Sequence, residues 1–327
     1  MKTLRLITVA IVLLFAGTAL VYAQDARDSQ DSQGVQSAGS EWQTLIQEVE
    51  DLYRQGQYQR SLAVARRALE IAEQNVGPEH PDVATSLNNL PFLYSTLGDH
   101  ARAEPLYKRS LVIREKVLGP NHPAVAISVN NLALMYAAQG DYDRAEPLYE
   151  RALAIDEIAL GPDHPDVAID LNNLAQLYDF RGDFARAEPL YRRALAIKEK
   201  ALGPDHPSVA TSLNNLALLY EDQGDYPEAE SLYKQALAID EKGLGPDHPD
   251  VAIELNNLAR VYATRGDYAA AEPLYDRALV IKERALGPSH PSVAISLDGL
   301  ADLYRNTERT EEAEKLEQRA AEIRAVK

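Results

Sequence analysis

The sequence predicts an all-α protein, an α-solenoid of stacked antiparallel helix pairs. The main observation is a 42-residue repeat, in which a His-Pro pair recurs at His80, His122, His164, His206, His248 and His290. A fixed period of this size is typical of stacked repeat arrays. Each repeat also contains two stretches with apolar residues at helical spacing, separated by a Gly-Asp pair.

Residues 1–23 have the features of an export signal. Lys2 and Arg5 give a short positive start, residues 6–20 are apolar, and Ala23 ends a small-residue cleavage site. We predict cleavage after Ala23 and an exported protein, periplasmic or secreted, of a bacterium. The alternative is an uncleaved membrane anchor, because the apolar stretch is nearly long enough to span a bilayer.

Residues 24–40 are predicted to be a disordered linker. They are rich in Gln, Ser, Asp and Gly and show no periodicity, so they cannot bury enough apolar surface to fold. The whole chain is acidic, with a formal net charge of -17, and contains no Cys. The charge argues against a nucleic-acid partner, and the lack of Cys excludes disulfides and zinc-thiolate sites.

One repeat, residues 119–160, illustrates how each helix pair is encoded. Gly119 and Pro120 end the preceding helix, and Pro123 starts a first helix that we expect to run to Gln139. Gly140 breaks this helix, and Asp141 is a good N-cap for a second helix that reaches about residue 160. Each repeat is therefore expected to form two antiparallel helices.

Prolines lie inside four of the predicted second helices. Each removes one backbone hydrogen bond, so we expect these helices to start late or to bend. The residues are Pro105, Pro147, Pro189 and Pro273.

The repeat resembles the tetratricopeptide repeat. The resemblance rests on Leu132-Ala133, Tyr136, Gly140-Asp141-Tyr142, Ala145, Tyr149 and Ala152-Leu153. The longer 42-residue form, with LNNLA, AEPLY and LGPDHP, resembles the repeats of kinesin light chains and related bacterial proteins. The resemblance implies a right-handed superhelix whose first helices line a concave groove.

The array is expected to occupy residues 41–327 as about seven repeats. The last repeat loses the Gly-Asp pair and becomes highly charged, which suits a terminal capping repeat. The predicted repeats are 42–83, 84–125, 126–167, 168–209, 210–251, 252–293 and 294–327.

The constant Tyr and His residues are interpreted as structural. The three Tyr positions typified by Tyr136, Tyr142 and Tyr149 are predicted to pack the helices of a pair together. Each His precedes a Pro at a helix start, where capping explains it. Neighbouring His residues would lie about 10 Å apart, too far to share a metal ion.

An Asn pair inside each first helix is the main candidate for binding. By resemblance, the first Asn of each pair points into the groove, where its amide could hold the backbone of an extended peptide. The second Asn is expected nearer the contact between repeats. The alternative is that both are structural. The first positions are Asn88, Asn130, Asn172, Asn214 and Asn256.

Groove positions that vary between repeats are predicted to select the ligand. We expect a protein or extended peptide with apolar side chains toward one end and basic ones in the middle. The remaining acidic residues are interpreted as solvated helix faces. The predicted selecting residues are Phe92, Leu134, Asp179, Phe180, Leu218, Glu221 and Asp222.

The sequence contains no motif of an enzyme, a metal site or a cofactor site: no Gly-rich phosphate loop, no nucleophile elbow and no HExxH. We therefore predict a non-catalytic protein- or peptide-binding scaffold without a cofactor. Two alternatives remain open. One is an envelope or extracellular assembly protein that acts through self-association, and the other is an accessory subunit of an enzyme encoded elsewhere.

Overall fold

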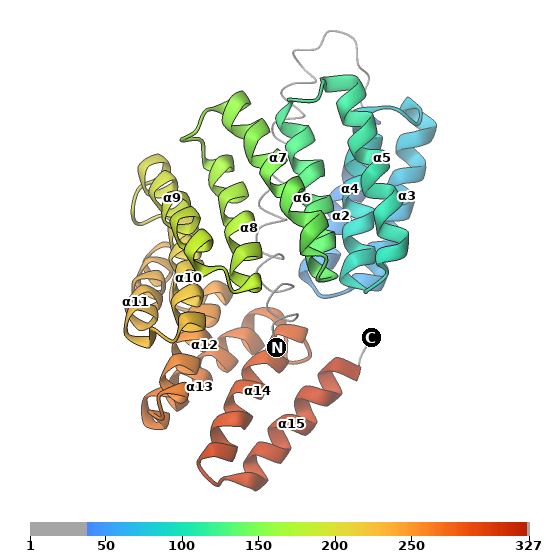
Figure 1. Ribbon diagram of the computed structural model, residues 1–327. Coiled ribbons are helices and arrows are strands. Elements are labelled where there is room, and N and C mark those ends of the chain that lie inside the picture. The colour runs from blue at the N-terminus through green and yellow to red at the C-terminus, as the bar shows by residue number, and fades with distance from the viewer. Residues whose placement is uncertain (1–37, 326–327) are drawn as a thin grey trace. The chain divides into compact units, whose positions relative to one another are not determined.

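The structure, a computed structural model, describes residues 38–325 (Figure 1). These residues form helices joined by short turns and contain no strand. The prediction of an all-α array of paired helices is thereby confirmed. The predicted export signal, and all but the last three residues of the predicted linker, lie outside the described residues. Within them, no helix combines the length and the apolar character needed to cross a membrane.

The chain divides into two compact units at residues 183 and 184, and each is described by itself. In unit 1 the helices are α2 (Ser40–Arg54), α3 (Tyr58–Val76), α4 (Pro81–Thr96), α5 (His100–Leu118), α6 (Pro123–Ala138), α7 (Tyr142–Leu160) and α8 (Pro165–Arg181). In unit 2 they are α9 (Phe184–Leu202), α10 (Pro207–Gln223), α11 (Tyr226–Gly243), α12 (Pro249–Thr264), α13 (Tyr268–Leu286), α14 (Pro291–Asn306) and α15 (Thr310–Ala325).

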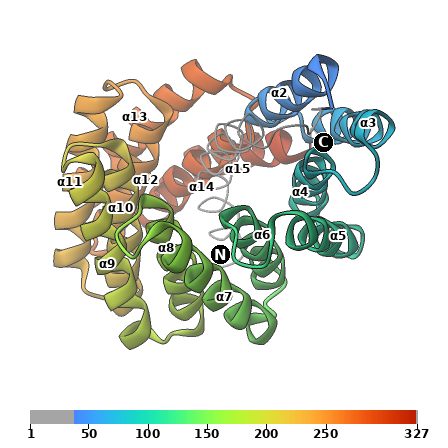
Figure 2. The same ribbon diagram turned by 90° about the horizontal axis from the view of Figure 1, so that it is seen from above.

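Even-numbered helices are the first helices of the repeats, and odd-numbered helices are the second helices. Within each unit every helix packs on the next one along the chain. First helices also pack on first helices, as α4 does on α6, α6 on α8, and α12 on α14. Figure 2 shows that, within each unit, the first helices form one layer and the second helices another.

The His-Pro pairs start the first helices, as predicted. Each His occupies the N-cap position, and its Nδ1 accepts a hydrogen bond from the backbone N–H two residues later, at 3.1 Å for His122 and 3.2 Å for His164. The following Pro has no N–H to leave unsatisfied in the first turn. An Asp caps the second helix in the same way, so Asp141 Oδ1 accepts from the N–H of Arg144 at 3.2 Å.

Tyr and Ala form the core between the two helices of a repeat. Ala133, Ala145 and Ala152 are fully buried, and Tyr149 is 2% exposed among them. Small side chains at these positions let the helix backbones approach while the aromatic ring fills the space between them. The predicted packing role is confirmed for Tyr136 and Tyr149, whereas Tyr142 at the helix start is only half-buried.

The expectation of late helix starts at the internal prolines is wrong. The helices that contain Pro147 and Pro273 begin at Tyr142 and Tyr268, directly after the capping Asp. Helix α11 has Ser231 at the same repeat position and starts at the equivalent Tyr226. The capping Asp therefore determines the start, and the helix continues through the Pro.

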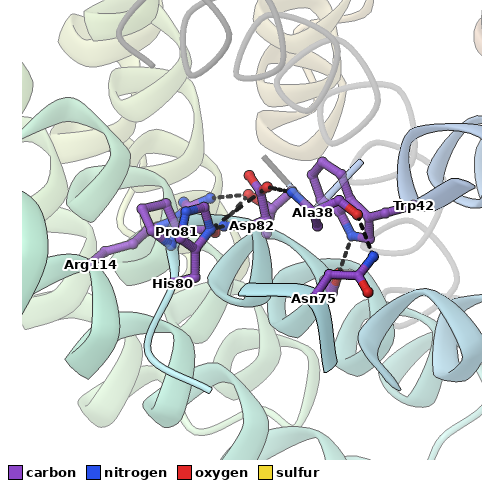
Figure 3. Close-up of polar contacts among 9 residues, drawn as sticks. Ala38, Trp42, Asn75, His80, Pro81, Asp82 and Arg114 are labelled. Atoms are coloured by element: carbon purple, nitrogen blue, oxygen red, sulfur yellow. Dashed lines mark hydrogen bonds and ion pairs between the residues drawn. The ribbon is translucent and has the colours of Figure 1, made fainter. Parts of the chain in front are cut away.

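The described fold begins at Ala38, which the sequence assigned to the linker. Ala38 is fully buried, and its N–H donates to Asp82 Oδ2 at 2.6 Å. Asn75 Nδ2 donates to the carbonyl of Ala38 at 2.7 Å. Figure 3 shows these two contacts on either side of Ala38. They attach the first residues of unit 1 to α3 and α4.

Candidate binding surface

The partly exposed residues of the first helices in unit 1 are mostly apolar. Phe92 in α4, Leu134 in α6 and Phe180 in α8 occupy the predicted ligand-selecting positions, and each is half-buried. Ile127 and Ile169, one to two turns earlier in α6 and α8, are also half-buried. We call these five residues the apolar face of unit 1. Because α4, α6 and α8 pack side by side, the apolar face extends over three repeats.

The corresponding positions in unit 2 carry charge. Leu218 in α10 is half-buried, but Arg260 stands at its position in the next repeat. Arg260 Nε and Nη2 donate to the two oxygens of Glu221 at 2.7 and 2.8 Å, and the hydroxyl of Tyr233 donates to Glu221 Oε2 at 3.0 Å. Bidentate pairing of this kind is the strong form of a salt bridge.

This pairing changes the prediction for Glu221. The sequence suggested an acidic groove residue available to a basic ligand, but its carboxylate is only 7% exposed and is bound by Arg260. Asp179, at the same repeat position in unit 1, is buried, with 8% of its surface exposed. Of the three predicted acidic positions, only Asp222 is exposed to solvent.

The first Asn of each pair lies at the contact between consecutive repeats. Asn88 Nδ2 donates to Ser128 Oγ at 3.4 Å, and Asn256 Nδ2 donates to Ser296 Oγ at 2.9 Å. Asn130 Nδ2 donates in the same way to Asp170 Oδ1. In each case the partner lies 40 residues later, on the next first helix. These bonds stitch neighbouring first helices together.

The second Asn takes part in the same network. Asn173 Nδ2 donates to Asn130 Oδ1 at 3.3 Å, and Asn257 Nδ2 donates to Asn214 Oδ1 at 2.9 Å. Among the first Asn residues, Asn130 is half-buried, whereas Asn88, Asn172, Asn214 and Asn256 are buried. The geometry therefore supports the structural alternative for both positions, and peptide binding by these Asn residues stays a prediction.

Several buried charged residues were missed by the sequence analysis, which placed the acidic residues on solvated faces. Asp156, Asp170, Asp240 and Glu254 are all buried, so that interpretation is wrong for them. Their repeat positions hold Arg114, Lys198, Lys282 or Ser in other repeats. A comparison of alternate repeats, 84 residues apart, would have revealed the pattern, because it repeats every second unit.

The glutamates of the AEPLY segments were also missed. The hydroxyls of Tyr178, Tyr220 and Tyr262 donate to Glu146, Glu188 and Glu230 at 3.1, 2.9 and 3.0 Å, always 32 residues apart. The constant spacing between Tyr and Glu was the available signal. This set of contacts joins a first helix to the second helix before it.

Comparisons with known proteins agree with this architecture. The family model described as tetratricopeptide repeat matches residues 43–116, 92–158, 125–200, 181–242, 208–284 and 250–325. No curated protein matches the chain. The chain is similar to a putative kinesin light chain with nearly identical repeats from Podosopora anserina, at 31% identity over 63% of this chain and 97% of that one, with a TM-score of 0.53.

Two further solved structures are similar. BtubC (BKLC) from P. vanneervenii is 29% identical over 72% of this chain and 92% of its own, with a TM-score of 0.54. The apo form of RapI is 16% identical over 88% of this chain and 98% of its own, with a TM-score of 0.61. The likeness to RapI concerns the fold alone.

Proposed function

Because the chain belongs to the tetratricopeptide repeat family, and resembles its kinesin-light-chain-like members, we propose that it is a non-catalytic scaffold that binds a protein or an extended peptide. The binding region in this proposal is the apolar face of unit 1. One observation carries it: Phe92, Leu134 and Phe180 are half-buried side chains that vary between repeats, on three first helices that pack side by side.

The proposed ligand presents apolar side chains to this face. Half-buried Phe, Leu and Ile side chains gain from losing their remaining contact with water, at roughly 25 cal/mol per Å² of apolar area. Asn173 and Gln176, both half-buried in α8, offer amide groups to the ligand backbone. A basic segment of the ligand would be placed near Asp222 rather than Glu221, because Arg260 already neutralises Glu221.

Peptide selection from a random display library tests the proposal, followed by affinity measurements on the selected peptide. Leu134→Glu and Phe180→Glu should each weaken binding at least tenfold, because a carboxylate would be desolvated by an apolar ligand. Val112→Glu and Ile158→Glu are the matched controls, since these residues are 61% and 74% exposed on second helices. Binding that depends on Val112 and Ile158, but not on Leu134 and Phe180, would place the site on the second helices instead.

The predicted Asn ladder is tested separately. Asn130→Ala removes the contact with Asp170, so it can reduce affinity simply by loosening the repeats. A direct role in binding requires that affinity falls while the free energy of unfolding stays within about 0.5 kcal/mol of the original value.

Export is part of the proposal and has its own test. Removal of residues 1–23 after Ala23 would leave a protein that starts at Gln24. Mass spectrometry of the protein recovered from the periplasm and culture fluid should find Gln24 as the first residue. Recovery of Met1 in the membrane fraction would support the uncleaved anchor.

A further inference from the structure

One position on each second helix faces the first helix of the next repeat, and its charge alternates along the chain. The residues at this position are Arg114, Asp156, Lys198, Asp240 and Lys282, and all are buried. The next first helix answers with Ser128, Asp170, Ser212, Glu254 and Ser296. Contacts with an acidic residue on both sides therefore alternate with contacts between a basic residue and Ser.

The first acidic seam consists of Asp156 on α7 with Asp166 and Asp170 on α8. Asp156 and Asp170 are 5% and 2% exposed, and their carboxyl groups lie within hydrogen-bonding reach of each other. Asp156 Oδ1 and Asp170 Oδ2 have no other hydrogen-bond partner. Two buried carboxylates this close cannot both ionise, because desolvation and mutual repulsion add. A proton shared between them gives each unpaired oxygen a partner.

Groups around the first seam supply no compensating positive charge. Helix α6 contributes the neutral amide of Asn130, which donates to Asp170. His164 Nδ1 lies 3.7 Å from Asp166 Oδ2, but the same nitrogen accepts the backbone N–H of Asp166. A nitrogen that accepts a hydrogen bond carries no proton, so the ring is neutral in this arrangement. Among the described residues, no group of His, Asp or Glu side chains is arranged to hold a metal ion.

The second acidic seam repeats this arrangement 84 residues later, with Asp240 on α11 and Asp250 and Glu254 on α12. Asp240 and Glu254 are 4% and 3% exposed, and Asp240 Oδ1 and Glu254 Oε2 have no hydrogen-bond partner. His248 Nδ1 accepts the N–H of Asp250, as His164 does in the first seam. Tyr233 on α11 also faces Glu254, and its hydroxyl donates to Glu221, whose charge is paired with Arg260.

The titration of these groups follows from their surroundings. Burial raises the pKa of Asp156 and of Asp240 to about 7, with a further increase from Asp166 and Asp250 respectively. Burial also holds the pKa of Asp170 and of Glu254 well above the ordinary range. Groups whose pKa is raised in the folded state favour folding most below their unfolded pKa, near 4, and this contribution is lost as the pH rises through about 7.

We propose that the two acidic seams are pH-sensitive contacts that hold consecutive repeats together when protonated and loosen when they lose protons. Loosening at the first seam separates α7 from α8, and α8 carries Phe180 of the apolar face. Loosening at the second separates α11 from α12. The basic contacts in between, such as Arg114 with Ser128, do not share this response. The inference does not depend on what the apolar face binds.

Hydrogen exchange of the purified protein between pH 5 and pH 8 tests this device, with rates corrected for the intrinsic effect of pH on exchange. Protection of amides in α8 and α12 should fall by up to about tenfold per pH unit for each proton released on opening. Amides in α6 and α14, next to the basic contacts with Arg114 and Lys282, should lose less protection over the same range.

The chain offers its own control for the test. The triple variant Asp156→Arg, Asp166→Ala, Asp170→Ser copies the residues Arg114, Ala124 and Ser128 of the basic contact before it. It should lose the pH response of α8 and keep that of α12. Asp170→Asn is a milder second variant, which keeps an acceptor for Asn130 while removing the need for a proton, and it should have the same effect.

Three outcomes would overturn the proposal. One is protection in α8 and α12 that does not change between pH 5 and pH 8. Another is an unchanged pH response of α8 in the Asp170→Asn variant. The third is a response that appears in EDTA and disappears with millimolar Ca²⁺ or Mg²⁺, because a cation would then compensate the carboxylates.

Discussion

The hydroxyl of Tyr136 donates a hydrogen bond to Glu104 Oε1 at 2.9 Å and joins α6 to the second helix before it. Lys108 and Tyr136 together hold the pKa of the Glu104 carboxyl below its ordinary value, because both donate to the ionised form. The ring of Tyr136 also lies under the guanidinium of Arg144, 4.2 Å from its centre. One side chain therefore connects parts of two repeats.

Tyr136→Phe should destabilise the protein by about 1 kcal/mol, because it removes one hydrogen bond to a charged acceptor and keeps the ring. Urea unfolding at pH 7 measures the effect. Tyr142→Phe in the same repeat is the control and should change stability by less, since the structure shows no hydrogen bond from its hydroxyl within residues 38–325. Equal losses in the two variants would contradict the role given to Glu104.

Glu221→Gln should cost about 1–3 kcal/mol, because Arg260 loses its charged partner in a largely buried setting. The double change Glu221→Ala and Arg260→Leu should recover most of that loss. It copies Ala263 and Leu218, which hold the same positions in neighbouring repeats. A double-mutant cycle from unfolding measurements checks the coupling, and strictly additive losses would refute it.

Gly299→Asn should destabilise the last repeat by roughly 1–3 kcal/mol through overpacking. Asn stands at this position in the five repeats before it, but a Cβ on Gly299 would lie 2.5 Å from Cε1 of Tyr275. Thermal unfolding of Gly299→Ala tests the Cβ by itself. Combining it with Tyr275→Leu should cost less than the sum of the two single changes, and full additivity would argue against the contact.

Lys282→Met should raise the free energy of unfolding at pH 7 by about 1–2 kcal/mol, given that one pKa unit is worth 1.36 kcal/mol. Lys282 is 4% exposed, and burial lowers the pKa of its ammonium group to about 8. A lowered pKa in the folded state makes the original protein more stable as the pH rises from about 8 toward the unfolded value.

The advantage of Lys282→Met should therefore shrink between pH 7 and pH 10. Urea unfolding at both pH values measures it, with the exposed Arg284→Met in the same helix as the control. A loss of stability in Lys282→Met at pH 7 would mean that the buried ammonium is stabilising.

The sequence was sufficient for the repeat, its helix boundaries and its caps. These features depend on local chemistry: Pro123 starts a helix and Gly140 ends the turn wherever they occur in the array. The predicted first helix from Pro123 to Gln139 ends one residue earlier, at Ala138. The core positions followed in the same way, because helical spacing places Val125 and Val129 on one buried side.

The candidate surface was less predictable, because it depends on contacts between residues about 40 positions apart. Asn130 looked available to a peptide until its amide was placed against Asp170 on the next first helix. Glu221 looked like a free acid until Arg260 was placed beside it, 39 residues later. Periodicity identifies which side of a helix a residue occupies, but it does not identify the partner on the neighbouring helix.

The acidic seams also bear on how such a chain changes length. Asp156 and Asp170 lie only 14 residues apart, on either side of one Gly-Pro loop. Gene duplication or deletion with breakpoints near Gly140 and Gly182 would therefore transfer this joint intact. Breakpoints inside the Gly-Pro loops would instead combine the second-helix residue of one joint with the first-helix residue of another, such as Arg114 with Asp170. Repeats in this protein are interchangeable at their turns, but their joints are inherited as matched pairs.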